Sequence, residues 1–130
     1  MRNKDRLRKK YSLLRKKKYF DIKSSFFKPL LELIKNNYKK KNIYISLYYP
    51  ASYEVNVIKL LDIINIKKIK TILPVINDGN SMYFYRWKKG DILKVNKYGM
   101  LEPNSLTKKV IPNVMLVPLL AFDNEKNRLG

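Results

Sequence analysis

The fold class of this chain is indicated by residues 42–76, which read NIYISLYYPASYEVNVIKLLDIINIKKIKTILPVI. Residues 42–49 alternate and are rich in Ile and Tyr, which is typical of a strand. Residues 54–65 carry a polar residue at every third position among apolar ones, which favours a helix, and residues 71–76 form a second apolar strand. A strand, a helix and a strand of this length predict a βαβ unit with parallel strands.

Two helices are expected before this unit. Residues 3–18 have apolar positions at spacings of four and three, which predict a helix with one apolar stripe. Residues 21–36 favour a second helix, with Pro29 in its first turn or at a kink, because an interior proline costs about 3 kcal/mol. The stripe of the first helix is Leu7, Tyr11 and Leu14, and the buried face of the second is expected to be Phe26, Phe27, Leu30, Leu31 and Ile34.

Further strands are expected over residues 82–87, 92–95 and 114–117, and the last should be central and buried. The sequence therefore predicts one α/β domain over residues 1–130. Its fold is expected to be a three-layer open, mostly parallel sheet with flanking helices and a basic helical N-terminus. Ligands of such sheets bind beyond the carboxyl ends of the strands. The segments there, 48–54, 74–82 and 118–130, supply aromatic rings, a carboxylate and a methionine, which suit a flat heterocycle.

Composition limits the chemistry of the chain. There is no cysteine or histidine, which excludes disulfides, thiolate chemistry and nucleophiles activated by histidine. The net charge of +19 is concentrated towards the N-terminus. We interpret it mainly as solvated surface, because Lys outnumbers Arg and Arg is the residue suited to base readout. A local anionic site and polynucleotide binding remain the alternatives.

The sequence does not predict an export signal or a membrane-spanning helix. The basic N-terminus is not followed by an apolar stretch, and no run approaches the roughly 18 apolar residues of a spanning helix. We expect a monomeric cytoplasmic protein with no membrane partner and no nucleic-acid partner.

Six short motifs occur in order along the chain. They are KDRLR at residues 4–8, YYP at 48–50 followed by EVN at 54–56, TILP at 71–74, MYF at 82–84, YGMLEP at 98–103, and VPLLAFD at 117–123 followed by NRLG at 127–130. Each motif alone is weak, but the set in this order and spacing resembles the 5-formyltetrahydrofolate cyclo-ligase family over nearly the whole chain.

The resemblance implies a reaction. Such enzymes convert 5-formyltetrahydrofolate to 5,10-methenyltetrahydrofolate with ATP and Mg²⁺. The formyl oxygen is phosphorylated, the folate N10 attacks the activated carbon, and phosphate departs. Chemistry of this kind depends on positioned cations and backbone N–H donors more than on acid–base side chains.

The resemblance also implies site residues. The ATP-binding residues would be Lys4, Arg8, Arg128, Leu129 and Gly130, and the substrate-binding residues would be Tyr49, Glu54, Met82 and Tyr98. Glu54 would accept hydrogen bonds from pterin N–H groups, or act as an acid at a helix N-terminus. Asp123 would lie near the phosphates, although a loop aspartate bonded to its own backbone is the alternative, and no metal ligand is expected within this chain. Trp87 matches no role and is expected to pack.

The family pattern continues beyond the last motif. After RLG it has a G-x-G-x-G-Y-Y-D loop, which would surround the phosphates with N–H groups and hold magnesium. We expect the chain to be C-terminally truncated relative to the family, either as a remnant or as half of a split enzyme, with a sheet edge and apolar surface left uncovered. The alternative is a non-catalytic module that binds folate or nucleic acid through its basic N-terminal arm.

Overall fold

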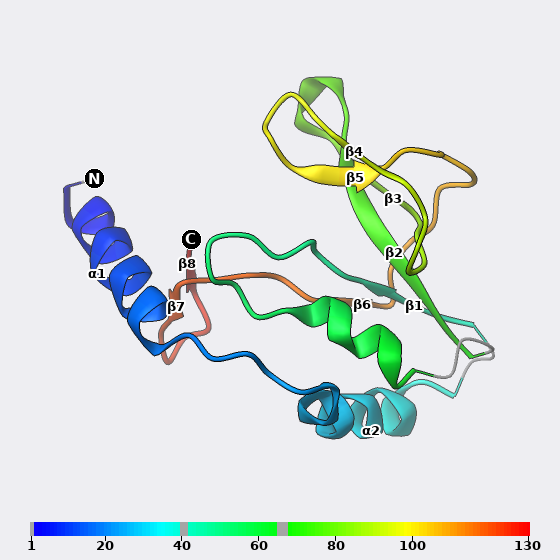
Figure 1. Ribbon diagram of the computed structural model, residues 1–130, viewed down its shortest axis with the longest axis horizontal. Coiled ribbons are helices and arrows are strands. Elements are labelled where there is room, and N and C mark those ends of the chain that lie inside the picture. Colours follow the sequence, from blue (N-terminus) through cyan, green and yellow to red (C-terminus); the bar gives the residue numbers. More distant parts are fainter. Residues whose placement is uncertain (1, 40–41, 65–67) are drawn as a thin grey trace.

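The computed structural model of the chain describes residues 2–39, 42–64 and 68–130 (Figure 1). The helices are α1 (Arg2–Lys18) and α2 (Lys28–Asn37), with the short 3₁₀ helices η1 (Ser24–Phe27), η2 (Val57–Asp62) and η3 (Asp78–Asn80). The strands are β1 (Ile43–Ser46), β2 (Ile69–Ile76), β3 (Met82–Arg86), β4 (Leu93–Val95), β5 (Leu101–Pro103), β6 (Val114–Met115), β7 (Ala121–Phe122) and β8 (Arg128–Leu129). The α/β class predicted from the sequence is confirmed.

The central sheet has four strands in the order β3-β2-β1-β6. Strand β1 pairs in parallel with both β2 and β6, and β3 pairs antiparallel with β2. The predicted parallel pairing on either side of residues 54–65 is therefore confirmed, and the sheet is mostly parallel. The strands β1, β2 and β6 end at the same edge, since parallel strands run in one direction.

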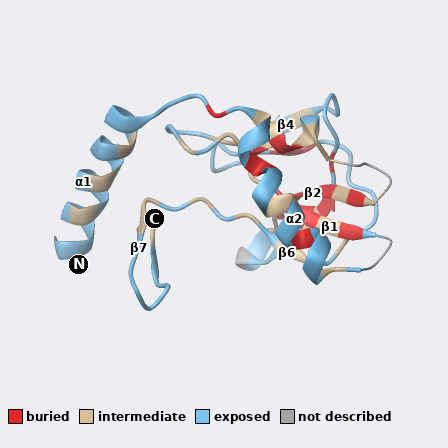
Figure 2. Ribbon diagram, turned by 90° about the horizontal axis from the view of Figure 1, so that it is seen from below, coloured by how far each residue is buried: buried red, intermediate tan, exposed pale blue. Residues whose placement is uncertain are grey.

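The main core lies between the sheet and a layer of helices. Ile43 and Ile45 of β1 and Leu73 of β2 point to this layer, because alternate residues of a strand share a face. Figure 2 shows that the buried residues concentrate here, whereas α1 and the β7–β8 hairpin carry almost none. The remaining buried members of the cluster are Ile22, Phe27, Ile34, Leu47, Val57, Leu60, Ile69 and Trp87.

Two hairpins lie outside the central sheet. The β4–β5 hairpin contacts β2, and its loop lies near Pro74 and Ile76, which face away from the helices. The β7–β8 hairpin follows β6 and lies beside α1 (Figures 1 and 2). Both hairpins therefore stand where they can line cavities at the edge of the sheet.

The helix predicted over residues 54–65 is wrong in type and length. The structure has a six-residue 3₁₀ helix, Val57–Asp62, and Asn65 lies outside the described residues. Asn56 caps the N-terminus of this 3₁₀ helix, since its side-chain oxygen accepts a hydrogen bond from the Ile58 N–H at 3.2 Å. The β-branched residues that follow also lower the propensity for an α-helix.

The helix predicted over residues 21–36 is divided in two. Lys23 is extended, η1 follows it, and α2 begins at Lys28 with Pro29 in its first turn, as one alternative expected. The change from η1 to α2 alters the helical phase, so Phe27 is buried while Phe26 is 58% exposed. Burial of Phe26 was therefore predicted wrongly.

The strand predicted as central over residues 114–117 is short and lies at an edge. Strand β6 pairs with β1 alone within the described part of the chain, and Met115 is 47% exposed. Val117 is also exposed, so this edge leaves apolar side chains in contact with solvent. The other strands are confirmed with boundaries shifted by a few residues.

Helix length was also compared with the thickness of a bilayer. Within residues 2–39, 42–64 and 68–130, no helix is both long enough and apolar enough to cross a membrane.

Candidate functional site

A cavity of ≈ 350 Å³ lies beyond the carboxyl ends of the parallel strands, and we call it the strand-end cavity. Its volume falls within the range of about 300–1,000 Å³ that is typical of small-molecule sites. Its walls are mainly aromatic and apolar, with one carboxylate and one amide. They include Tyr48, Tyr49, Pro74, Ile76, Met82 and Pro118, with Glu54 and Asn96 as the polar members.

Three of the four predicted substrate-binding residues line this cavity. Tyr49, Glu54 and Met82 are brought together from two segments that are distant in the sequence. Tyr98 does not line the cavity and is 54% exposed, with the Lys97 ammonium 5.2 Å from its ring centroid. The next residues of its loop, Gly99 and Met100, take that place.

A strained turn holds Glu54. Ser52 and Tyr53 have positive φ angles of 47° and 64°, a conformation that costs a non-glycine residue about 1–2 kcal/mol. The turn is closed twice: the Glu54 N–H donates to the Ala51 carbonyl at 2.9 Å, and the Ala51 N–H donates to Glu54 Oε1 at 2.8 Å. Strain of this kind is commonly retained where a side chain must be positioned.

The carboxylate of Glu54 turns back towards Ala51 rather than capping η2. Its second oxygen, Oε2, accepts no hydrogen bond from the part of the chain that the structure describes. This oxygen is therefore free to accept from N–H groups of a bound molecule.

Tyr48 stands beside Glu54 as a neutral phenol. Its hydroxyl donates to the Val55 carbonyl at 2.9 Å. Burial, followed by the Glu54 charge, raises the pKa of Tyr48 to about 12, and the nearby Arg15 acts against this rise. Tyr48 therefore offers a ring and a fixed hydroxyl to the cavity, and no charge at neutral pH.

A second cavity of ≈ 630 Å³ lies between α1 and the β7–β8 hairpin, and we call it the helix–hairpin cavity. Lys4 lines it from α1, while Arg128 and Leu129 line it from β8. Two opposite ends of the chain thus supply its two cations. Arg8 does not line it; its Nη1 atom is 3.0 Å from Asp5 Oδ1.

A third cavity of ≈ 390 Å³ shares lining residues with each of the first two, and we call it the junction cavity. It shares Glu54 and Pro118 with the strand-end cavity and Arg128 with the helix–hairpin cavity. Gly130 also lines it, with φ of +94°, and a Cβ there would be 2.9 Å from Leu120 Cγ. Only glycine fits this position without displacing Leu120.

The Asp123 carboxylate accepts hydrogen bonds within its own turn. Its Oδ1 accepts from the Asn127 N–H at 2.8 Å, and its Oδ2 accepts from Asn127 Nδ2 at 3.0 Å. These hydrogen bonds lower the pKa of the exposed Asp123 carboxyl. The alternative of a loop aspartate bonded locally is therefore what the structure contains. Within the described residues, no group of three His, Cys, Asp or Glu residues is placed to hold a metal ion.

Asn96 was missed by the sequence reasoning, although turn chemistry provides a signal. Its Oδ1 accepts from the N–H groups of Tyr98 and Met100 at 2.9 and 3.0 Å. Its Nδ2 donates to Glu102 Oε2 at 3.3 Å, and Glu102 is 6% exposed. Asn and Gly at such spacing predict a tight turn. The YGMLEP motif thus shapes one wall of the strand-end cavity, because Asn96 and Glu102 hold its loop.

Arg15 was also missed, and only helical spacing could have suggested it. Leu7 and Tyr11 of the predicted stripe are half-buried, but Leu14 is 39% exposed. The half-buried face continues instead to Arg15, which lines the junction cavity.

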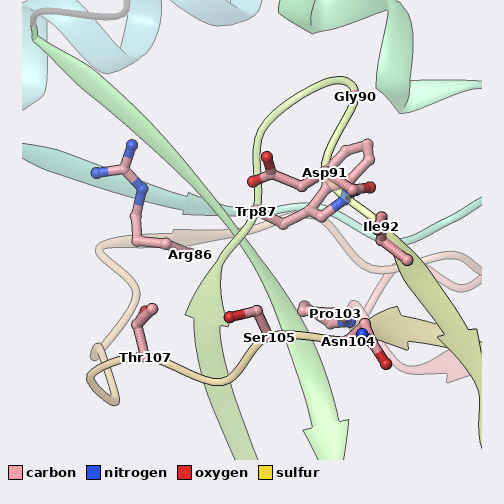
Figure 3. A pocket seen from close by; sticks show the side chains of 9 residues that line it. All are labelled: Arg86, Trp87, Gly90, Asp91, Ile92, Pro103, Asn104, Ser105 and Thr107. Carbon is pink, nitrogen blue, oxygen red and sulfur yellow. Dashed lines mark hydrogen bonds between the residues drawn. The ribbon is translucent and has the colours of Figure 1, made fainter.

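A fourth cavity, of ≈ 410 Å³, lies away from the predicted residues (Figure 3). Trp87 lines it and is 4% exposed, and its Nε1 donates to the Asp91 carbonyl at 3.0 Å. The expected packing role of Trp87 is confirmed. The Arg86 side chain points away from the Trp87 ring.

Comparisons with known proteins point to one family. A sequence model of the 5-formyltetrahydrofolate cyclo-ligase family matches residues 1–130. The 5-formyltetrahydrofolate cyclo-ligase of Haemophilus influenzae is 29% identical over 92 residues, covering 66% of this chain and 49% of that protein. A probable 5-formyltetrahydrofolate cyclo-ligase of Schizosaccharomyces pombe is 28% identical over 96 residues, covering 69% of this chain and 47% of that protein.

A solved structure is similar along almost the entire chain. The NMR structure of Aquifex aeolicus 5,10-methenyltetrahydrofolate synthetase superimposes with a TM-score of 0.60 and 28% identity, covering 98% of this chain and 66% of that one. The chain spans about half the length of the two curated relatives. The match over all 130 residues and the shared fold establish that this chain belongs to the 5-formyltetrahydrofolate cyclo-ligase family.

Proposed function

We propose that the chain binds 5-formyltetrahydrofolate in the strand-end cavity and ATP in the helix–hairpin cavity, and takes part in forming 5,10-methenyltetrahydrofolate. One observation carries the proposal. The junction cavity shares lining residues both with the cavity lined by Tyr49, Glu54 and Met82 and with the cavity lined by Lys4 and Arg128. The two reactants would thus occupy adjoining sites on one chain.

The strand-end cavity suits a reduced pterin. A flat heterocycle packs well between an aromatic ring such as Tyr49 and apolar walls such as Met82. The pterin N–H groups would donate to Glu54 Oε2. A hydrogen bond to an ionised carboxylate is about twice as strong as a neutral one.

The helix–hairpin cavity suits the phosphates of a nucleotide. Lys4 offers a compact charge and Arg128 a planar fork, which together neutralise a polyanion. Arg8 is 3.0 Å from Asp5 in this structure and would bind phosphate only after leaving that pair. Leu129 would contact the nucleotide through its side chain, and Gly130 would allow the backbone to approach it.

We propose that Mg²⁺ arrives with the nucleotide, since it usually binds through substrate phosphates and one or two carboxylates. Asp123 is the carboxylate that lines this cavity, but both of its oxygens already accept hydrogen bonds from Asn127. The described residues therefore do not form a magnesium site by themselves.

The bonds formed and broken balance within the two reactants. The formyl oxygen would attack the terminal phosphorus of ATP, and ADP would leave with the electron pair of the broken P–O bond. N10 would then attack the formyl carbon and lose its proton, and phosphate would depart with the electron pair of the broken C–O bond and take up that proton. In this sequence Glu54 holds the pterin ring, while Lys4 and Arg128 balance the charge on the phosphates.

The test has a binding part and a turnover part. Calorimetric titration of the purified chain with 5-formyltetrahydrofolate and with ATP measures the two sites separately. The absorbance rise of methenyltetrahydrofolate measures turnover, with the Haemophilus influenzae enzyme as a positive control. We expect both ligands to bind. Failure of a folded sample to bind 5-formyltetrahydrofolate would refute the proposal.

The turnover result would also decide how much of the activity lies in these 130 residues. The chain spans about half the length of its curated relatives, and the family's G-x-G-x-G-Y-Y-D loop is not among its residues. We propose that residues 1–130 form a single domain, active as a cytoplasmic monomer only when such a loop is supplied. Turnover by the chain alone would contradict this part of the proposal.

A second candidate function is polynucleotide binding through α1. Its last turn carries Arg15, Lys16, Lys17 and Lys18, and the three lysines are exposed. Binding of mixed-sequence RNA that weakens steeply with salt, without any response to folate or ATP, would favour this function over the first.

A further inference from the structure

Arg15 is placed on α1 so that it reaches the centre of the candidate site. Lys4, Leu7, Tyr11 and Arg15 are spaced by three, four and four residues, so they share one face of the helix. Lys4, Leu7 and Tyr11 line the helix–hairpin cavity, while Arg15 lines the junction cavity. Arg15 is half-buried, whereas its neighbours in the sequence are exposed.

The guanidinium of Arg15 lacks a partner. Its Nε atom is buried and makes no hydrogen bond, and Arg15 forms no ion pair, within the part of the chain that the structure describes. A guanidinium carries five N–H donors and keeps its charge at any physiological pH. Because a buried N–H donor without an acceptor is unfavourable, the Nε atom of Arg15 calls for a partner that binds there.

The acidic neighbour does not provide that partner. Glu54 lines the same cavity, but its Oε1 accepts from the Ala51 N–H at 2.8 Å, and no ion pair joins Glu54 to Arg15. The charge of Arg15 acts on Tyr48 and lowers its pKa against the larger effect of burial. Arg15 lines the junction cavity together with Ala51, Glu54 and Pro118, which also line the strand-end cavity, so it lies on the side where the two cavities meet.

Arg128 is the second cation of the junction cavity. Its Nη1 donates to the Pro118 carbonyl at 3.2 Å, which fixes the fork at the entrance from the helix–hairpin cavity. The side chains that line this cavity of ≈ 390 Å³ thus include two guanidiniums and one carboxylate. Planar forks of this kind match the oxygens of a phosphoryl or carboxylate group.

The side chains of Lys4 and Arg15 cannot bind the same oxygen atoms of a ligand. They are eleven residues apart on one helix, which corresponds to about 16 Å along its axis at a rise of about 1.5 Å per residue. Lys4 would therefore hold one part of an extended polyanion, and Arg15 would hold the part nearest the strand-end cavity.

We propose that the junction cavity is an oxyanion site, and that Arg15 together with Arg128 binds the terminal phosphoryl group of the nucleotide there. This inference rests on the proposed function and adds to it the residue that meets the group to be transferred. A second source of the same oxyanion chemistry is a carboxylate of the folate's glutamate tail. The position between the two reactant cavities favours the phosphoryl group.

The experiment compares Arg15→Gln and Arg15→Lys with Arg6→Gln. Arg6 is exposed on the same helix, so its replacement removes the same charge without touching the junction cavity. Calorimetric titrations are run with ATP, ADP, 5-formyltetrahydrofolate and 5-formyltetrahydropteroate, which has no glutamate. Circular dichroism of each variant confirms that its fold is unchanged.

We expect Arg15→Gln to weaken ATP binding by about 10- to 100-fold, the effect of losing a charged hydrogen-bonding partner. ADP binding should fall by less than about threefold, because ADP lacks the terminal phosphoryl group. Arg15→Lys should lie in between, since a point charge replaces the fork. Arg6→Gln should stay within about twofold of the unmodified chain.

Other outcomes would overturn the inference. Equal weakening of ATP and ADP, or no weakening of either, means that Arg15 does not meet the terminal phosphoryl group. Weaker binding of 5-formyltetrahydrofolate but not of 5-formyltetrahydropteroate assigns Arg15 to the glutamate tail instead. An unmodified chain that binds folate but not ATP overturns this inference and leaves the folate site standing. An unmodified chain that binds neither ligand overturns the proposed function as well.

Discussion

Replacing Glu54 by Gln removes one charge from the strand-end cavity and leaves its shape unchanged. The Gln carbonyl can still accept the hydrogen bond from the Ala51 N–H, now 2.8 Å from Oε1, so the strained turn should persist. The amide NH₂ then replaces Oε2 and faces the pterin N–H groups, donor against donor. Losing one or two charged hydrogen bonds in this way costs about 2–4 kcal/mol, so the Kd for 5-formyltetrahydrofolate should rise by about 30- to 1,000-fold.

The assay is calorimetric titration of Glu54→Gln with 5-formyltetrahydrofolate and with ATP. ATP binding should not weaken, because the proposed contacts of Lys4 and Arg128 remain and the lost Glu54 carboxylate, which also lines the junction cavity, would repel a phosphate. Glu32→Gln is the matched control, since Glu32 is an exposed acid of α2 that lines none of these cavities. Folate binding by Glu54→Gln within about threefold of the unmodified chain would refute the assignment of Glu54 as the pterin acceptor.

Three further predictions concern stability and ionisation. Leu60 is fully buried, so Leu60→Ala should lower the free energy of unfolding in urea by about 2–5 kcal/mol, whereas Asp91→Asn on the surface should change it by less than about 1 kcal/mol. The raised pKa of Tyr48 stabilises the folded chain below pH 10.0, and this contribution to stability should be lost as the pH rises from there to about 12. The measurement is an ultraviolet titration of the tyrosines, and the prediction is contradicted when Tyr48→Phe does not remove the last tyrosine ionisation. The lowered pKa of Asp123 means that its turn is intact above pH 3.8 and loosens as the pH falls through the lowered value, which the Asn127 amide should report by NMR.

The sheet was largely predictable from local patterns. Alternation over residues 42–49 and the apolar run over 71–76 predicted two strands, and the polar–apolar segment between them predicted their parallel pairing. The intervening helix was predicted wrongly, because periodicity cannot distinguish a long α-helix from a short 3₁₀ helix capped by Asn56. The edge position of β6 could not be predicted from the sequence, since neighbours in a sheet are set by contacts between distant residues.

The sequence motifs predicted residues of the strand-end cavity, but they did not predict most of its geometry. The YYP and EVN motifs indicated Tyr49 and Glu54, which do lie together. No pattern indicated that Ser52 and Tyr53 would take positive φ angles, because that conformation is imposed by the strand before the turn and the helix after it.

By itself, the sequence determined the α/β class, the family and the residue types of a heterocycle site, because local propensity and motif spacing are written along the chain. Only the tertiary structure decided which basic residues line the cavities. The KDRLR motif singled out Lys4 and Arg8 but not Arg15, yet Lys4 and Arg15 reach cavities while Arg8 contacts Asp5. The physical reason is that the role of a charged side chain depends on the groups that surround it. Those surroundings come from the β7–β8 hairpin and the turn before Glu54, which only folding brings to α1.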